Sequence, residues 1–152
     1  MAGSRKEREE LLEKVSMFSA LNKKEVGRLA AVADERRVPS GTVLTKEGEP
    51  GDEFYVVAEG MAEASIGGRK VGSIPAGSFF GEMSLLDEGP RTATVTAELP
   101  TRLVVITAKD FGRVLEEVPA ISLKIMRGLA SRIRQADEDW GPKPTARRTR
   151  KK

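Results

Sequence analysis

Residues 78–97 read SFFGEMSLLDEGPRTATVTA, and this stretch decides which fold and which site we expect. A glycine followed by an acid, Gly81-Glu82, opens a short helical turn, and a lone arginine, Arg91, stands just before a run of alternating residues. In that run threonines alternate with small apolar residues, which gives a β-strand two differently lined faces. We therefore expect a glycine turn, a short helix and a strand, with Arg91 at the start of the strand.

The same stretch carries groups that bind a phosphodiester. Such an anion needs backbone N–H donors at the start of a helix and a guanidinium that can bridge two oxygens. Gly81 allows the backbone to approach closely, and we expect the N–H groups of Met83 and Ser84 to face the anion. Arg91 supplies a positive charge that does not titrate. Glu82 repels a phosphate but can accept from a ribose hydroxyl, so the sequence predicts a ligand with both sugar and phosphate.

Outward from this stretch, residues 36–106 alternate between short β-favouring runs and turn sequences. The runs are TVLT, EFYVVA, AEASI, KVGSI, TATVTA and RLVVI, and the sequences between them include GEPGD, EG, GG, IPAGS and ELP. Many short strands at regular spacing predict an antiparallel roll or barrel.

Helical patterns flank the strands on both sides. Two N-terminal helices are predicted over residues 4–16 and 22–33, because each begins with a capping box. The capping pairs are Ser4 with Glu7 and Asn22 with Glu25. After the strands, Thr107 is expected to cap a helix that Pro119 ends. A longer helix follows over residues 120–138, with an expected inward stripe of Ser122, Met126, Leu129 and Ile133.

The predicted fold class is α+β, with a jelly-roll-like antiparallel β-roll flanked by N-terminal helices and two C-terminal helices. We divide the chain into an N-terminal helix (1–17), one domain (18–138) and a basic tail (139–152). The last twelve residues, GPKPTARRTRKK, carry six bases and no acid, whereas the rest of the chain holds 20 bases and 23 acids. This tail is expected to be disordered.

The composition excludes many kinds of catalytic and metal site. With no cysteine and no histidine, the chain has no thiol nucleophile, no disulfide, no imidazole base and no His or Cys ligand for zinc or iron. We predict that the protein is not an enzyme and has no metal site. No apolar run reaches the roughly 18 residues that span a bilayer, and the N-terminus alternates acids and bases. The expected location is the cytoplasm, with no transmembrane segment.

The quoted stretch resembles the phosphate-binding cassette of the cyclic nucleotide-binding domain family. The family pattern is an apolar residue, Gly-Glu, any residue, a small residue, an apolar residue, a spacer, and then Arg-[Ser/Thr/Ala]-Ala-x-apolar. The chain meets this pattern without a gap at Phe80, Gly81, Glu82, Ser84, Leu85, Arg91, Thr92, Ala93 and Val95. Residues 48–60 are similar to the family's first signature, 107–119 to its hinge helix and 120–138 to its lid helix. The resemblance covers roughly residues 18–138.

This resemblance implies a binding site for a cyclic nucleotide. It implies that Gly81 and Glu82 hold the ribose 2′-hydroxyl. It also implies that Arg91 and the backbone of Ser84 hold the cyclic phosphate, which Thr92 touches as well. Thr92 can in addition reach the base.

The resemblance also bears on the base and on the identity of the ligand. In channel-type members a lid arginine contacts the base; its ungapped equivalent here is Arg132, which can equally be a surface arginine, with Arg127 and Arg134 as nearby substitutes. A threonine after the cassette arginine is typical of cGMP-responsive kinase sites, but bacterial and channel members with Thr or Ser there accept cAMP. The expected regulatory ligand is therefore cAMP or cGMP, with cAMP favoured, and no cofactor is expected.

The leading hypothesis is a cyclic nucleotide sensor in which the ligand closes the lid helix and so regulates a separate effector protein. The alternative is a nucleic-acid-binding or scaffold protein that uses the basic tail, residues 141–152, while the domain has lost its ligand. The same tail can add affinity for an anionic lipid surface. A cupin-type enzyme also uses a β-roll, but this chain has no histidine for a metal triad.

Overall fold

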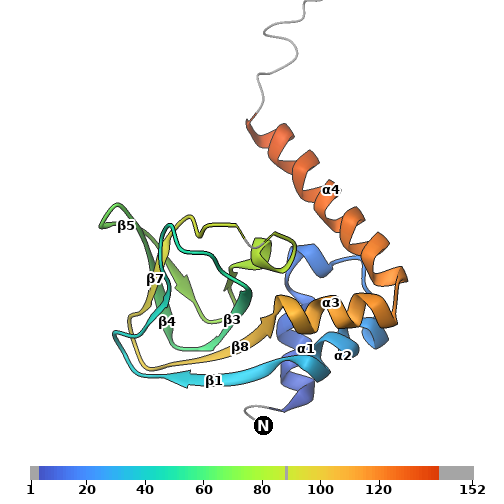
Figure 1. The fold of residues 1–152 in the computed structure, drawn as a ribbon, viewed down its shortest axis with the longest axis horizontal. Helices are drawn as coiled ribbons and strands as arrows, with labels where there is room; N and C mark the ends of the chain where they lie inside the picture. Colours follow the sequence, from blue (N-terminus) through green and yellow to red (C-terminus); the bar gives the residue numbers. More distant parts are fainter. Residues whose placement is uncertain (1–3, 88, 141–152) are drawn as a thin grey trace, which may run out of the picture.

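Two antiparallel four-stranded sheets form a β-roll, and the helices gather at one end of it (Figure 1). The computed structural model describes residues 4–87 and 89–140 of the chain. The strands are β1 (Asp34–Val38), β2 (Val43–Thr45), β3 (Glu53–Glu59), β4 (Met61–Ile66), β5 (Arg69–Pro75), β6 (Phe79–Phe80), β7 (Thr94–Ala97) and β8 (Thr101–Thr107). The helices are α1 (Arg5–Glu13), α2 (Lys23–Val32), α3 (Ala108–Glu117) and α4 (Ala120–Trp140), with short 3₁₀ helices η1 (Ser16–Phe18) and η2 (Glu82–Leu85). The predicted α+β class with a β-roll is confirmed.

The strand order places β8 and β3 at the centre of one sheet. That sheet is ordered β1-β8-β3-β6, and the other is ordered β2-β7-β4-β5. All six runs predicted as strands form strands, whereas β1 and β6 were not predicted. The sequence of β1, DERRV, lacks apolar alternation. Instead, Glu35 forms an ion pair with Arg102 of the neighbouring β8, and Arg36 forms one with Glu53 of β3, one strand further.

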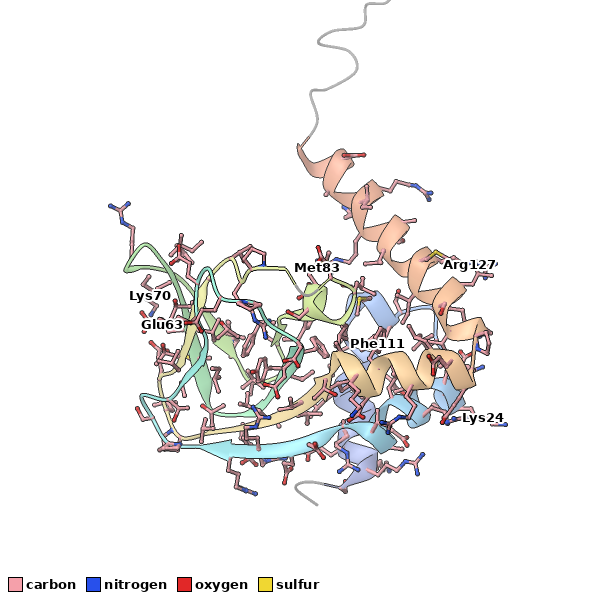
Figure 2. The ribbon with its side chains drawn as sticks, viewed as in Figure 1. Lys24, Glu63, Lys70, Met83, Phe111 and Arg127 are labelled. Carbon is pink, nitrogen blue, oxygen red and sulfur yellow. The ribbon has the colours of Figure 1, made fainter. Side chains whose placement is uncertain are left out.

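The two faces of the central strands line two separate cores. Along β3, Phe54 and Val56 face the helices, while Tyr55 and Val57 face the interior of the roll, as the two-residue period of a strand requires. On the helical side, the ring of Phe18 lies 6.0 Å from that of Phe54 and 6.3 Å from that of Phe111, centroid to centroid. Figure 2 shows Phe111 on α3, facing this core.

The two N-terminal capping pairs form different sets of hydrogen bonds. Asn22 and Glu25 form the complete predicted capping box, and Glu25 also accepts from Lys124 Nζ of α4 at 2.8 and 2.9 Å. The hydrogen bonds that Glu25 accepts lower its pKa, and the bond from Lys124 has the largest effect. Burial opposes this change. At the first helix, Ser4 Oγ accepts from the N–H of Glu7, and the Glu7 carboxylate accepts from Arg102 of β8.

Arg102 joins the N-terminal helix to the sheet. Its side chain is only 2% exposed, and its two terminal nitrogens meet carboxylates from three elements. Nη1 and Nη2 donate to Glu7 of α1 at 2.9 and 2.7 Å, and Nη1 donates to Glu35 of β1 at 2.7 Å. Nη2 also lies 3.2 Å from a carboxylate oxygen of Glu59 on β3. A charge this deeply buried requires such compensation.

The inward face of α4 differs from the predicted stripe. Met126 and Ile133 are 58% and 64% exposed, so that part of the prediction is wrong. Over residues 120–137, the part of α4 whose burial is described, the buried residues are Ile121, Ile125 and Gly128, and Gly128 lies against the backbone of η1. The apolar residues of this helix lie on two adjacent faces, one sequence position apart. The face that contains Gly128 packs against η1, so the other face stays exposed. Beyond Gly128, α4 projects away from the roll (Figure 1).

The final helix continues to Trp140, two residues past its predicted end at 138. The prediction of a disordered tail over residues 139–152 is wrong for 139 and 140, because they are helical. The rest of that tail, residues 141–152, lies outside the described residues. Among the helices that the structure describes, none combines the length and the apolar character that crossing a membrane would require.

Candidate ligand-binding site

A pocket of about 410 Å³ lies between the interior of the roll and η2. Its volume falls in the range of roughly 300–1,000 Å³ that is usual for small-molecule sites. The roll contributes the residues Thr45, Ala64, Ile74, Phe80 and Val95. The rest of the lining comes from the predicted cassette: Gly81, Glu82, Met83, Ser84, Asp87, Gly89, Pro90, Arg91, Thr92 and Ala93.

Two glycines allow Arg91 to lie flat against the backbone. A Cβ atom on Gly51 would come within 1.9 Å of Arg91 Nε, and one on Gly81 would come within 2.8 Å of Nη1. Gly81 also has a φ of +81°, in the left-handed region that glycine adopts without strain. Larger residues at either position would displace the guanidinium from the pocket wall.

Neutral oxygen atoms hold the guanidinium of Arg91 in place. Nη1 donates to Ser84 Oγ at 2.7 Å, and Nη2 donates to the main-chain carbonyl of Glu53 at 2.9 Å. Within residues 4–87 and 89–140, no carboxylate forms an ion pair with Arg91. The main chain of Arg91 is bonded to Gly48 and Glu49, so the first signature loop and the cassette are joined at this residue. Among the described residues, Arg91 therefore carries a fixed positive charge without a direct counter-charge.

The 3₁₀ helix η2 alters one expected contact. The sequence predicts that the N–H of Ser84 faces the anion, but this N–H donates to the carbonyl of Gly81 at 3.0 Å and closes the turn. Ser84 instead contributes its hydroxyl oxygen, which accepts a hydrogen bond from Arg91. Met83 of η2 lines the pocket, yet its side chain is largely exposed (Figure 2).

Glu82 and Arg132 meet at the edge of the pocket. Arg132 Nη1 of α4 donates to Glu82 Oε2 at 3.1 Å, so the structure brings this predicted lid arginine to the cassette. Arg127, one of its possible substitutes, points away from the roll (Figure 2). Thr92 is exposed and lines the pocket. The structure thus gathers all the predicted site residues in or beside one pocket.

The residues that pack beneath Arg91, namely Tyr55, Glu53 and Arg36, were missed by the sequence reasoning. The Tyr55 ring stacks on Phe80 at 4.7 Å, and the Tyr55 hydroxyl donates to Glu53 Oε1 at 2.6 Å. Burial, with the carboxylate of Glu53 beside it, raises the pKa of Tyr55 to about 12. Arg36 donates to both Glu53 carboxylate oxygens at 3.2 and 3.0 Å, and this lowers the pKa of Glu53. The sequence signal that could have indicated these contacts is the spacing of Glu53 and Tyr55, which lie two residues apart on one face of a strand.

The described residues offer no group of acidic side chains arranged to hold a metal ion. The polar side chains of the pocket are instead the two carboxylates of Glu82 and Asp87, the guanidinium of Arg91 and the hydroxyl groups of Thr45, Ser84 and Thr92. This set can bind an organic anion that also carries hydroxyl groups.

Comparison with known proteins agrees with this geometry. The family model of the cyclic nucleotide-binding domain matches residues 35–118. The cAMP-dependent protein kinase regulatory subunit of Emericella nidulans is 37% identical over 115 residues, which are 74% of this chain and 28% of that protein. The chain spans less than a third of the length of the curated relatives it matches.

Two solved structures resemble the whole arrangement. The N-terminal domain of a transcriptional regulator from Streptomyces coelicolor A3(2) is 30% identical with a TM-score of 0.77, over 85% of this chain and 94% of that one. The regulatory domain of Toxoplasma gondii PKA, solved with cAMP, is 28% identical with a TM-score of 0.67, over 84% of this chain and 50% of that one. Both likenesses include helices as well as the roll, since they extend beyond residues 35–118.

Proposed function

The chain belongs to the cyclic nucleotide-binding domain family, and we propose that it is a non-enzymatic sensor that binds one cyclic nucleotide in the pocket beside η2. In this proposal Arg91 binds the cyclic phosphate, and Glu82 with Gly81 binds the ribose 2′-hydroxyl. The observation that carries the proposal is the guanidinium of Arg91, which lines the pocket without a carboxylate partner among the described residues.

Arg91 has the donors that a phosphate needs. A guanidinium carries five N–H donors, and the described side-chain contacts of Arg91 use two of them. The remaining donors can bind phosphate oxygens, and the uncompensated charge is favourable for an anion in a partly enclosed pocket. Gly51 and Gly81 keep this charge at the wall, where a ligand can reach it.

Glu82 suits the sugar because a ribose hydroxyl donates and a carboxylate accepts. In the structure this carboxylate is bound by Arg132. We propose that a ribose hydroxyl takes over that acceptor, so that Arg132 is released and becomes free to contact the base. The exposed hydroxyl of Thr92 lies where it can meet the phosphate or the base.

The favoured ligand is cAMP, with cGMP as the second choice. The curated relatives include cAMP-dependent protein kinase regulatory subunits, and one similar structure was solved with cAMP. Thr92 is compatible with either base. We therefore propose cAMP as the regulatory ligand, in the absence of any cofactor.

The position of α4 suggests how binding could be transmitted. Its first turns are anchored by Ile121, by Ile125 and by the pair between Lys124 and Glu25. Its later part is exposed and reaches the cassette through Arg132. We propose that this part closes over the bound ligand and presents an altered helical surface to a separate effector protein. The ligand drives closure only by the difference in its affinity for the closed and open states.

Glu82→Ala is expected to weaken cAMP binding by about 10- to 100-fold, the usual size of a hydrogen bond to a charged group. The loss should depend on the 2′-hydroxyl of the ligand. Isothermal titration with cAMP and 2′-deoxy-cAMP measures this dependence in the wild type and in the variant. The wild type should prefer cAMP by a similar factor, and the variant should bind both ligands about equally.

A Glu82→Ala variant that still distinguishes the two ligands as strongly as the wild type would remove Glu82 from the ribose contact. Glu63→Ala is the matched control, since Glu63 is a half-buried carboxylate of β4 that does not line the pocket. This control should leave the preference for cAMP unchanged.

A further inference from the structure

We infer that Arg36 is a positioning residue for the phosphate site, because it holds the carboxylate of Glu53 in a fork that keeps it from pairing with Arg91. This inference rests on the proposed function of Arg91. It assigns a role to a residue that lies outside the pocket lining and outside the cassette.

The strand order brings Arg36 to Glu53 across an intervening strand. Arg36 of β1 is paired with Leu103 of β8, and Tyr55 of β3 is paired with Val105 of β8. Leu103 and Val105 both face the interior of the roll. Arg36 therefore extends over β8 on this inner face and reaches Glu53 at the start of β3.

The Glu53 carboxylate is fully engaged in this arrangement. Its Oε1 accepts from Arg36 Nη1 and from the Tyr55 hydroxyl, and its Oε2 accepts from Arg36 Nη2. Two charge-assisted bonds in a fork fix both the position and the direction of the carboxylate. The Glu53 carboxylate is therefore paired with Arg36 of β1.

Arg91 lies close enough to compete for the same carboxylate. Its Nη2 already binds the main-chain carbonyl of Glu53, and its guanidinium carbon lies 6.0 Å from the centroid of the Tyr55 ring. The guanidinium carbon of Arg36 lies at the same distance from that ring. The charge of Arg91 also contributes to the lowered pKa of Glu53, after the hydrogen bonds from Arg36 and Tyr55.

Loss of Arg36 would leave Arg91 as the nearest cation for Glu53. A carboxylate bound to Arg91 would have to be displaced by the phosphate, which lowers the apparent affinity for the ligand. A tenfold change in affinity corresponds to about 1.4 kcal/mol, which is within the usual range of coupling energies between residues of one charged network. Removal of the Glu53 charge should abolish the competition and restore binding.

A double-mutant cycle tests the inference by isothermal titration of the whole chain with cAMP. Arg36→Met is expected to weaken binding about tenfold. Glu53→Gln and the double variant Arg36→Met/Glu53→Gln are both expected to stay within about threefold of the wild type. Arg37→Met is the matched control: it removes the same charge from the next, exposed position of β1 and should also stay within about threefold.

Three results would overturn the inference. The first is a wild-type affinity in Arg36→Met, and the second is a double variant as weak as Arg36→Met alone. The third is an equal loss in Arg37→Met, which would indicate a general charge effect. Arg36→Gln retains a polar side chain and repeats the first of these tests, so it should weaken binding as Arg36→Met does. Failure of the wild type to bind any cyclic nucleotide would instead contradict the proposed function.

Discussion

Arg91→Ala is expected to weaken the binding of cAMP by about 100-fold or more. Truncation of one partner of a buried, hydrogen-bonded charge pair typically costs about 2–5 kcal/mol. Here the loss removes the charge that lines the pocket and also frees Ser84 Oγ and the carbonyl of Glu53 from their donor. Isothermal titration of the variant with cAMP measures the effect.

Arg91→Lys separates the charge from the geometry. An ammonium keeps the charge but cannot reach two acceptors and a phosphate with the same planar fork. Its affinity should therefore lie between those of the wild type and Arg91→Ala. Arg69→Ala on β5 removes the same charge at an exposed position away from the pocket and should bind normally. An Arg91→Ala variant within about threefold of the wild type would show that the phosphate lies elsewhere.

Arg102→Met is expected to destabilise the folded chain by about 3–5 kcal/mol, the usual cost of removing one partner from a buried ion pair. The substitution leaves Glu7 and Glu35 facing each other without their shared cation. It also removes the ion pair between α1 and β8. Urea unfolding at pH 7, followed by circular dichroism, gives the change in the free energy of unfolding.

The matched control for Arg102→Met is Lys70→Met, which breaks the exposed pair between Lys70 and Glu98. Surface pairs contribute about 0–1 kcal/mol, so the control should unfold almost as the wild type does. Neutralising two of the acids that Arg102 binds, in Arg102→Met/Glu7→Gln/Glu35→Gln, should recover part of the lost stability. A loss below about 1 kcal/mol in Arg102→Met would mean that the buried charge cluster does not hold α1 in place.

The residues of the cassette were predictable because they are close together in the chain. Gly81, Glu82 and Arg91 lie on one turn, one short helix and the approach to one strand, so local spacing already places them around a common point. The apolar alternation of β7 was equally local. Its buried Val95 and Ala97 alternate with half-buried Thr94 and Thr96, as expected.

The contacts beneath the cassette could not be predicted in this way. Arg36 and Glu53 meet only because β8 lies between β1 and β3, and the sequence does not specify that order. The charged strand β1 was missed for a related reason, since its side chains are satisfied by ion pairs across the sheet. These partners become visible only once the strands are arranged.

Helix α4 shows a different limit of prediction from the sequence. Two apolar stripes fit its helical period, one through Ile121 and Ile125 and one through Met126 and Ile133. The packing surface of η1 decides between them, and it selects the stripe with Ile121 and Ile125. The contact of Arg132 with Glu82 follows from this orientation of the helix.

Isothermal titration calorimetry of the wild-type chain with cAMP, and separately with cGMP, tests the central claim most directly. Because Arg91 lines a pocket and pairs with no acid in the part of the chain that the structure describes, the protein should bind cAMP saturably, with one nucleotide per chain. Binding of cGMP should be weaker. The absence of binding for both nucleotides at millimolar concentration would contradict the account.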